Sequence, residues 1–348
     1  MERYYKWERY YMRGYEHIVG QDQIKDFIKK SACRRKVAHA YIFCGEKGSG
    51  RTELARLFAA ALQCSRDYDE WDIDGFDKPC GECRSCLQMA SGNQPDVITL
   101  IHDKKSIGVD DIREQINNKV DIKPYAGPYK IYIIPEADKM TEQAQNALLK
   151  TIEEPPEYAV IMLIAESVGS LLPTILSRCV QLNLRPLSEK VIEDYLMKNY
   201  KLPDYIAQTS AVFAQGNIGK AIRYATDEDF IATKDEVIRA VKSLANKRTD
   251  ELMDIAKRIK SENYVVDDYL DIILLWYRDI LLYKAVKDPS MLLFKEEAAD
   301  IDRQARIRSY ENIERCVNAI DKAKQRLNAN VNFEVTMELL LITLKEIS

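Results

Sequence analysis

Short apolar runs alternate with longer amphipathic stretches along the first two-thirds of the chain. The apolar runs predict strands, and the intervening segments, in which apolar positions recur three or four residues apart, predict helices. The predicted strands are 41–44, 97–100, 131–134 and 160–164, and the predicted helices are 21–34, 52–62, 109–120, 142–153 and the short 173–177. Because helices separate successive strands, the pattern predicts an α/β fold with a parallel sheet that is covered on both faces.

The strand pattern ends near residue 185. From 188 to 348 the periodicity is helical throughout, with long amphipathic runs at 250–260, 265–282 and 310–327. We therefore expect four parts, which are an N-terminal extension over 1–14, an α/β domain over 15–185, an all-α domain over 186–248 and a second all-α domain over 249–348.

The composition is that of a folded protein, since 46% of the 348 residues are hydrophobic and 30% are charged. The 51 basic and 55 acidic residues give a net charge of −4, which argues against a strongly basic nucleic-acid-binding protein. The longest apolar stretch, 158–165, is far shorter than the ~20 residues of a membrane-spanning helix. The N-terminal residues contain no apolar signal segment. These features predict a soluble, cytoplasmic protein without a membrane partner.

Eight cysteines are present, and the spacing of four of them is informative. Cys80, Cys83 and Cys86 form a C-x2-C-x2-C motif, and Cys64 follows an apolar helical run upstream. In a reducing compartment such a cluster indicates a metal site rather than disulfides. Four thiolates suit tetrahedral zinc, with Zn–S distances near ~2.3 Å. We therefore predict a zinc site on these four residues, which would anchor the polar loop between Cys64 and Cys80.

Two other interpretations of the cysteines are weaker. An iron–sulfur cluster of the bacterial ferredoxin type needs a fourth cysteine followed by proline just downstream, and residues 87–94 contain no cysteine. Scattered packing thiols rarely occur at such regular intervals beside a glycine such as Gly81. The other four cysteines are spread singly and are expected to be packing residues, and they are Cys33, Cys44, Cys179 and Cys316.

A glycine-rich segment between the first strand and its helix, 45–52, predicts a phosphate-binding loop. Its glycines let successive backbone N–H groups surround phosphates, and Thr52 offers a hydroxyl to Mg²⁺. Arg51 replaces the lysine of a Walker A motif, and its planar guanidinium is not a compact point charge. Binding of ATP or ADP is left open, and efficient catalysis is not expected. The candidate nucleotide-binding residues in this loop are Gly45, Gly48, Gly50, Arg51 and Thr52.

The Walker B position departs from its pattern as well. A Walker B strand ends in Asp-Glu, and its aspartate holds Mg²⁺. Here the strand 131–134 is followed by Pro135 and Glu136, so the magnesium carboxylate is missing and only the second carboxylate is kept. Together with Arg51, this predicts that the chain has lost efficient ATP hydrolysis. The alternative is that the loop now only shapes the joint between strand and helix.

Further stretches are distinctive, and they are Ile-Val-Gly-Gln at 18–21, His-Ala-Tyr-Ile-Phe at 39–43, Ala-Gln-Asn-Ala-Leu-Leu-Lys at 144–150, Glu-Glu-Pro-Pro at 153–156 and Leu-Pro-Thr-Ile-Leu-Ser-Arg-Cys at 172–179. With the P-loop and the four-cysteine insertion after its helix, they resemble the clamp-loader branch of AAA+ proteins, and within it the delta-prime subunits of bacterial DNA polymerase III. The matching motifs span residues 15–225. The resemblance implies an AAA+ domain with a zinc module at 64–86, a helical lid and a helical collar for oligomerisation.

The resemblance also implies a role for Arg178. In this family the arginine of the Ser-Arg-Cys motif serves as a finger that reaches the ATP of a neighbouring subunit. Without the resemblance, Arg178 would be interpreted as a helix-terminal cation that the helix dipole favours. The two sensor positions of the family, near Glu166 and at Gly219, do not keep the expected polar residue and arginine. These departures are typical of a subunit that completes its neighbour's site without being a motor.

Three functions follow from these residues. The favoured one is a delta-prime-type subunit that helps to load the sliding clamp on primed DNA, with tau/gamma and delta subunits as partners, and with the clamp and primer–template DNA contacted through the complex. The second is an active ATPase motor of the tau/gamma type, which would need lysine at position 51 and aspartate at 135. The third is a zinc-stabilised nucleic-acid-binding protein, which the acidic charge and the absence of a basic stripe with stacking aromatics disfavour.

Overall fold

The computed structural model describes residues 15, 18–66, 79–244, 247–261, 265–329 and 331–347. The predicted extension over 1–14 and most of the loop between Cys64 and Cys80 lie outside the described residues. The chain divides into two compact units, Met1–Ala221 and Ile222–Ser348, and each is described by itself. No helix in the described part of the chain is long and apolar enough to cross a membrane. The finer division into four parts stays a prediction.

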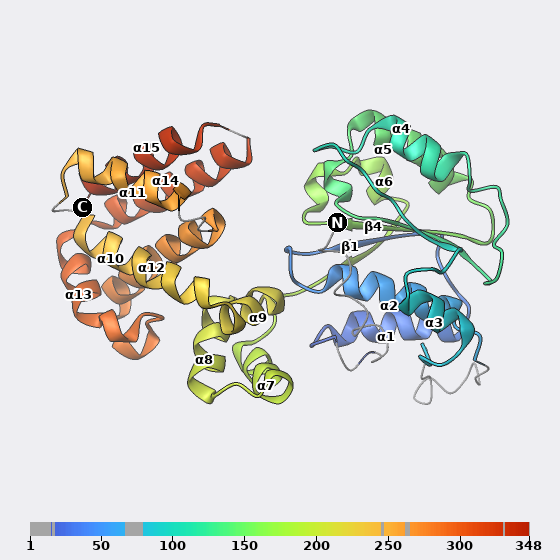
Figure 1. Ribbon diagram of the computed structural model, residues 1–348, viewed down its shortest axis with the longest axis horizontal. Helices are drawn as coiled ribbons and strands as arrows, with labels where there is room; N and C mark the ends of the chain where they lie inside the picture. The colour runs from blue at the N-terminus through green and yellow to red at the C-terminus, as the bar shows by residue number, and fades with distance from the viewer. Residues whose placement is uncertain are drawn as a thin grey trace. The chain divides into compact units, whose positions relative to one another are not determined.

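A five-stranded parallel sheet forms the centre of the first unit (Figure 1). Its strands lie in the order β2-β3-β4-β1-β5, and they are β1 (Ala40–Cys44), β2 (Val97–Thr99), β3 (Lys130–Ile134), β4 (Ala159–Ala165) and β5 (Val180–Asn183). The sequence pattern predicts the first four strands but misses β5. That edge strand leaves Gln181 and Asn183 exposed, so it shows no continuous apolar run.

Helices cover both faces of this sheet, as Figure 1 shows. On one face lie α1 (Asp22–Cys33), α2 (Arg51–Gln63) and α3 (Arg84–Ala90), and on the other lie α4 (Val109–Ile112), α5 (Glu142–Glu153) and α6 (Pro173–Leu176). Side chains alternate between the two cores along each strand, so Tyr41 and Phe43 face the first set of helices and Ile42 faces the second. The predicted α/β fold with a parallel sheet is confirmed.

One predicted helix is interrupted. The sequence pattern predicts a single helix over 109–120, whereas α4 ends at Ile112 and continues as a π-helical turn over Arg113–Asn117. Ile112 and Ile116 are buried on the sheet, so the apolar stripe that suggested one helix is retained through the turn. The wider π-helical turn is a backbone feature that side-chain periodicity alone does not reveal.

The remaining elements are helical. In the first unit, α7 (Glu189–Tyr200) packs against α8 (Asp204–Phe213), and α9 (Ile218–Thr226) begins there. The second unit contains α10 (Glu228–Ser243), α11 (Thr249–Ser261), α12 (Val266–Val286), α13 (Ala298–Ile307), α14 (Tyr310–Asn328) and α15 (Phe333–Glu346). Helix α12 packs against α10, α13 and α14, and its Tyr269, Trp276 and Tyr277 are fully buried. The all-α character predicted for the C-terminal part is confirmed.

Candidate functional site

The predicted phosphate-binding loop joins β1 to α2. Gly48 and Gly50 have φ angles of 92° and 95°, in the left-handed region that glycine adopts without strain. A Cβ atom at Gly48 would lie 2.8 Å from Oδ1 of Asn217, so this position also has no room for a side chain. The loop therefore has the glycine-dependent curvature that the sequence predicts.

Arg51 is buried and is held by its own chain. Its Nη1 donates a hydrogen bond to the carbonyl oxygen of Gly45 at 2.5 Å, and its Nη2 lies 3.0 Å from Oε1 of Glu166, which follows β4. The guanidinium is thus paired within the protein, at the position where a Walker A lysine would contact phosphates. This arrangement explains how the loop accommodates an arginine, and it leaves that arginine engaged by protein atoms.

The segment that leads into α9 contacts the loop directly. The Gly219 N–H donates to the carbonyl oxygen of Gly48 at 3.0 Å, and a Cβ at Gly219 would lie 2.7 Å from that oxygen. Asn217 Nδ2 donates to Oε2 of Glu46 at 3.0 Å, while Lys220 Nζ lies 2.7 Å from Oε1 of the same carboxylate. The loop is therefore held by its own chain, through a carbonyl oxygen and a carboxylate, and Gly219 lies where the family's second sensor would carry an arginine.

Glu136 keeps its carboxylate but is engaged by two neighbours. Its Oε1 accepts a hydrogen bond from Lys139 at 2.8 Å, and its Oε2 lies 3.3 Å from Nε2 of His102. The Lys139 hydrogen bond, with a smaller contribution from His102, lowers the pKa of Glu136. A carboxylate held ionised in this way is a weaker base toward water. Pro135 precedes it and offers no carboxylate to magnesium.

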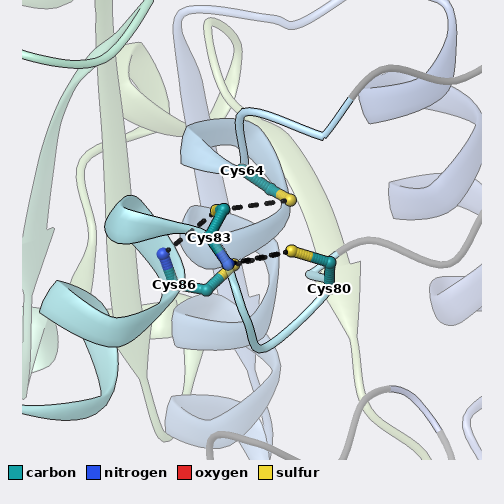
Figure 2. Close-up of side chains that lie close together, drawn as sticks. All are labelled: Cys64, Cys80, Cys83 and Cys86. Atoms are coloured by element: carbon teal, nitrogen blue, oxygen red, sulfur yellow. Dashed lines mark hydrogen bonds between the residues drawn. The ribbon is translucent and has the colours of Figure 1, made fainter.

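The four cysteines of the predicted zinc site converge, as Figure 2 shows. Cys64 lies at the end of α2, while Cys80, Cys83 and Cys86 lie in the turn before α3 and in its first residues. Their Sγ atoms all lie within 4.8 Å of one another, and the Cys64–Cys83 and Cys80–Cys86 pairs are each 4.0 Å apart. Tetrahedral zinc with ~2.3 Å bonds requires sulfur–sulfur distances of about 3.8 Å. The thiol cluster therefore fits a zinc ion.

Hydrogen bonds within the cluster favour the thiolate form of Cys64, one of the four sulfurs that a metal would bind. The backbone N–H of Cys83 donates to Cys80 Sγ at 3.4 Å, and that of Cys86 donates to Cys83 Sγ at 3.5 Å. The thiol of Cys86 is the main cause that lowers the pKa of Cys64 to about 4, and the same contact raises the pKa of Cys86. Bound zinc would hold all four sulfurs as thiolates.

Arg178 lies on the surface between two fixed elements. It follows α6, whose Ile175 is fully buried, and β5 begins two residues later. Burial raises the pKa of the adjacent Cys179 to about 12, whereas the Arg178 side chain is 42% exposed. The side chain therefore extends from a rigid attachment into an accessible position.

The structure thus brings together the predicted residues of the loop and of the cysteine cluster, and it adds partners that the sequence analysis does not identify. Glu166 contacts Arg51, and His102 contacts Glu136. Asn217 contacts Glu46 within the loop. Asn217 lies in a glycine-flanked turn, which is a weak signal for a side chain with a capping role. All of these contacts join residues that are far apart in sequence, so no local pattern reveals which residues pair.

Comparison with known proteins identifies the family. A family model described as "DNA polymerase III, delta subunit" matches residues 20–188. The chain is 30% identical over 335 residues to DNA polymerase III subunit delta' of Bacillus subtilis (strain 168), which covers 94% of this chain and 96% of that protein. It is also 27% identical to subunit tau of the same strain, over 93% of this chain but 60% of tau.

Among solved structures, a DNA polymerase III gamma subunit-related protein of Thermotoga maritima aligns with a TM-score of 0.48 and 20% identity, over 94% of this chain and 98% of that one. The Bacillus subtilis clamp loader delta protein aligns with a TM-score of 0.34 and 14% identity, over 93% and 99%. The near-complete match to subunit delta' establishes the assignment. The chain therefore belongs to the family of the delta' subunits of DNA polymerase III.

Proposed function

We propose that this chain is the delta-prime-type subunit of a cytoplasmic clamp loader and helps to load the sliding clamp on primed DNA. It assembles with tau/gamma and delta subunits, and it meets the clamp and the primer–template DNA through the complex. The identity to subunit delta' over nearly the whole of both chains supports this role, because the match to tau leaves 40% of tau uncovered.

The chain's own ATPase activity is lost in this proposal. Arg51 is paired with Gly45 and Glu166, and Pro135 supplies no ligand to magnesium. Gly219, which has no side chain, contacts Gly48 at the position where the family's second sensor carries an arginine. These three features separate the chain from a motor of the tau/gamma type.

Arg178 acts in trans as an arginine finger. The observation that carries this role is the exposed guanidinium on a fixed surface position of a chain that lacks the Walker A lysine and the magnesium carboxylate. An arginine supplied by a neighbour stabilises the charge on the transferring phosphoryl group, and such fingers accelerate hydrolysis by ~10³–10⁵ in well-studied cases. The finger therefore serves ATP that is bound to an adjacent subunit.

The second helical domain, over 249–348, forms the oligomerisation collar.

The four cysteines hold a structural zinc ion. Zinc at Cys64, Cys80, Cys83 and Cys86 joins the end of α2 to α3 and fixes both ends of the intervening loop. The thiol ligands are all provided by the protein, so the site has no open position for catalysis.

The test is a reconstituted loader that contains Arg178→Ala. We expect the variant subunit to fold and to assemble, because an exposed arginine contributes little to stability. DNA-stimulated ATP turnover should fall only in part, since the other sites keep their own fingers. Arg178→Lys should rescue poorly because lysine keeps the charge but not the fork geometry. Wild-type turnover with Arg178→Ala, at matched assembly, would reject the finger role.

A further inference from the structure

We infer that Glu153 is a positioning residue that sets the direction of the Arg178 guanidinium. The inference rests on the finger role proposed above. It adds a second residue to that role, one that contacts Arg178 within the same chain and does not reach the neighbouring nucleotide itself.

The guanidinium of Arg178 is held along one edge. Its Nε lies 3.0 Å from Oε1 of Glu153, and its Nη1 donates to the Thr174 carbonyl oxygen and to Ser177 Oγ, both at 3.2 Å. No hydrogen bond joins Nη2 to a described residue. Two of the three nitrogens are therefore fixed by the protein, and the third remains to bind an anionic oxygen.

The position of Glu153 in its helix is unfavourable for a carboxylate unless a cation lies beside it. It is the last residue of α5, where the helix dipole places partial negative charge and disfavours a glutamate. The cation of Arg178 offsets that unfavourable charge. Glu154, the next residue, is exposed, and its carboxylate makes no hydrogen bond or ion pair with any described residue, so only one of the two adjacent carboxylates is paired with the arginine.

The backbones that carry the two side chains are tied together within the first unit. Gln145 of α5 donates from Nε2 to the carbonyl oxygen of Ser170 at 3.0 Å and accepts from the Leu172 N–H at 2.7 Å. Gln145 is itself buried, and α5 packs against α6. The backbone positions of Glu153 and Arg178 are therefore fixed relative to each other.

The pair affects orientation more than stability. Both side chains are nearly half exposed, 42% for Arg178 and 46% for Glu153, and exposed ion pairs contribute little to folding. A cation that is already aimed at the position of the developing charge needs no reorganisation during the reaction. Loss of the carboxylate should therefore leave the subunit folded and allow the finger to adopt unproductive directions.

The experiment compares Glu153→Gln with Glu154→Gln in the reconstituted loader, at matched assembly. Glu153→Gln keeps the size of the side chain and removes its charge, and Glu154→Gln makes the same change at the neighbouring unpaired carboxylate. We expect Glu153→Gln to lower the kcat of DNA-stimulated hydrolysis by about threefold or more toward the level of Arg178→Ala, with little change in KM. Glu154→Gln should remain at the wild-type rate.

A double-mutant cycle separates positioning from any other role of Glu153. If Glu153 acts through the finger, Glu153→Gln should cause no further loss in a chain that already carries Arg178→Ala. An added loss in that background, or an unchanged or higher rate for Glu153→Gln alone, would overturn the inference. Wild-type turnover for Arg178→Ala would instead reject the finger role itself, so the two failures are distinguishable.

Discussion

The Arg51 side chain contacts Gly45 and Glu166 of its own chain, whereas a Walker A lysine contacts phosphates. The sequence is sufficient to predict that a compact charge is missing, because the motif and its departure lie within eight residues. It is not sufficient to predict where the guanidinium goes. Glu166 is 115 residues away, and it approaches Arg51 only because β4 lies beside β1 in the sheet.

We expect negligible ATP turnover by the isolated chain, since Arg51 and Pro135 remove the roles of lysine and of the magnesium carboxylate. The double change Arg51→Lys with Pro135→Asp need not restore it, because the two sensor positions, near Glu166 and at Gly219, also depart from the family. A steady-state phosphate-release assay provides the measurement, with a motor subunit as the positive control. Hydrolysis at ordinary AAA+ rates would favour the motor function instead.

At the scale of elements, the spacing of residues along the chain predicts a local turn better than it predicts an edge strand or a change of helix type. The turn over 80–86 is predictable because three cysteines and Gly81 lie within seven residues, and the structure gives Gly81 the positive φ of 75° that such a turn needs. The edge strand β5 and the π-helical turn after α4 are missed, since one is half exposed and the other keeps the apolar stripe of an ordinary helix.

The cysteine cluster leads to a prediction about these elements. Purified protein should contain close to one zinc per chain, and Cys83→Ser should lower both the zinc content and the thermal stability. Acidification should release the ion, because ligand thiolates are protonated as the pH falls. Metal analysis with thermal unfolding provides the test, and Cys316→Ser, which alters a single buried thiol outside the cluster, is the control. Metal-free protein of unchanged stability would contradict a structural site.

At the scale of the whole molecule, the proposed oligomerisation collar belongs to the second unit. Its described helices leave several large apolar side chains exposed, among them Ile307 at 71%, Val335 at 59% and Leu339 at 45%. Such side chains mark a protein–protein contact only where they form a contiguous patch, and an assembly domain would need such a patch. The sequence predicts the helices of this part from their periodicity, but a single sequence does not reveal which faces remain uncovered.

A chain that ends at Thr226 should therefore fold, retain zinc and fail to enter the loader. The truncation removes the helices of the second unit from α10 onward and leaves the sheet, its covering helices and the cysteine cluster intact. Size-exclusion chromatography with the other subunits, together with metal analysis, measures both properties. Normal assembly of the truncated chain would show that the contacts lie in the first unit and that no collar is needed.

The contact between Gly48 and Gly219 also has a consequence for thermodynamic linkage. A protein whose native state binds a ligand at 100 times its Kd gains about 2.7 kcal/mol of stability from that ligand. Here, bonds within the chain already hold the loop, through the Gly48 carbonyl oxygen and the Glu46 carboxylate. A loop that bound no nucleotide would leave the folded population of this subunit to these contacts, and that population would not follow the ratio of ATP to ADP in the cell.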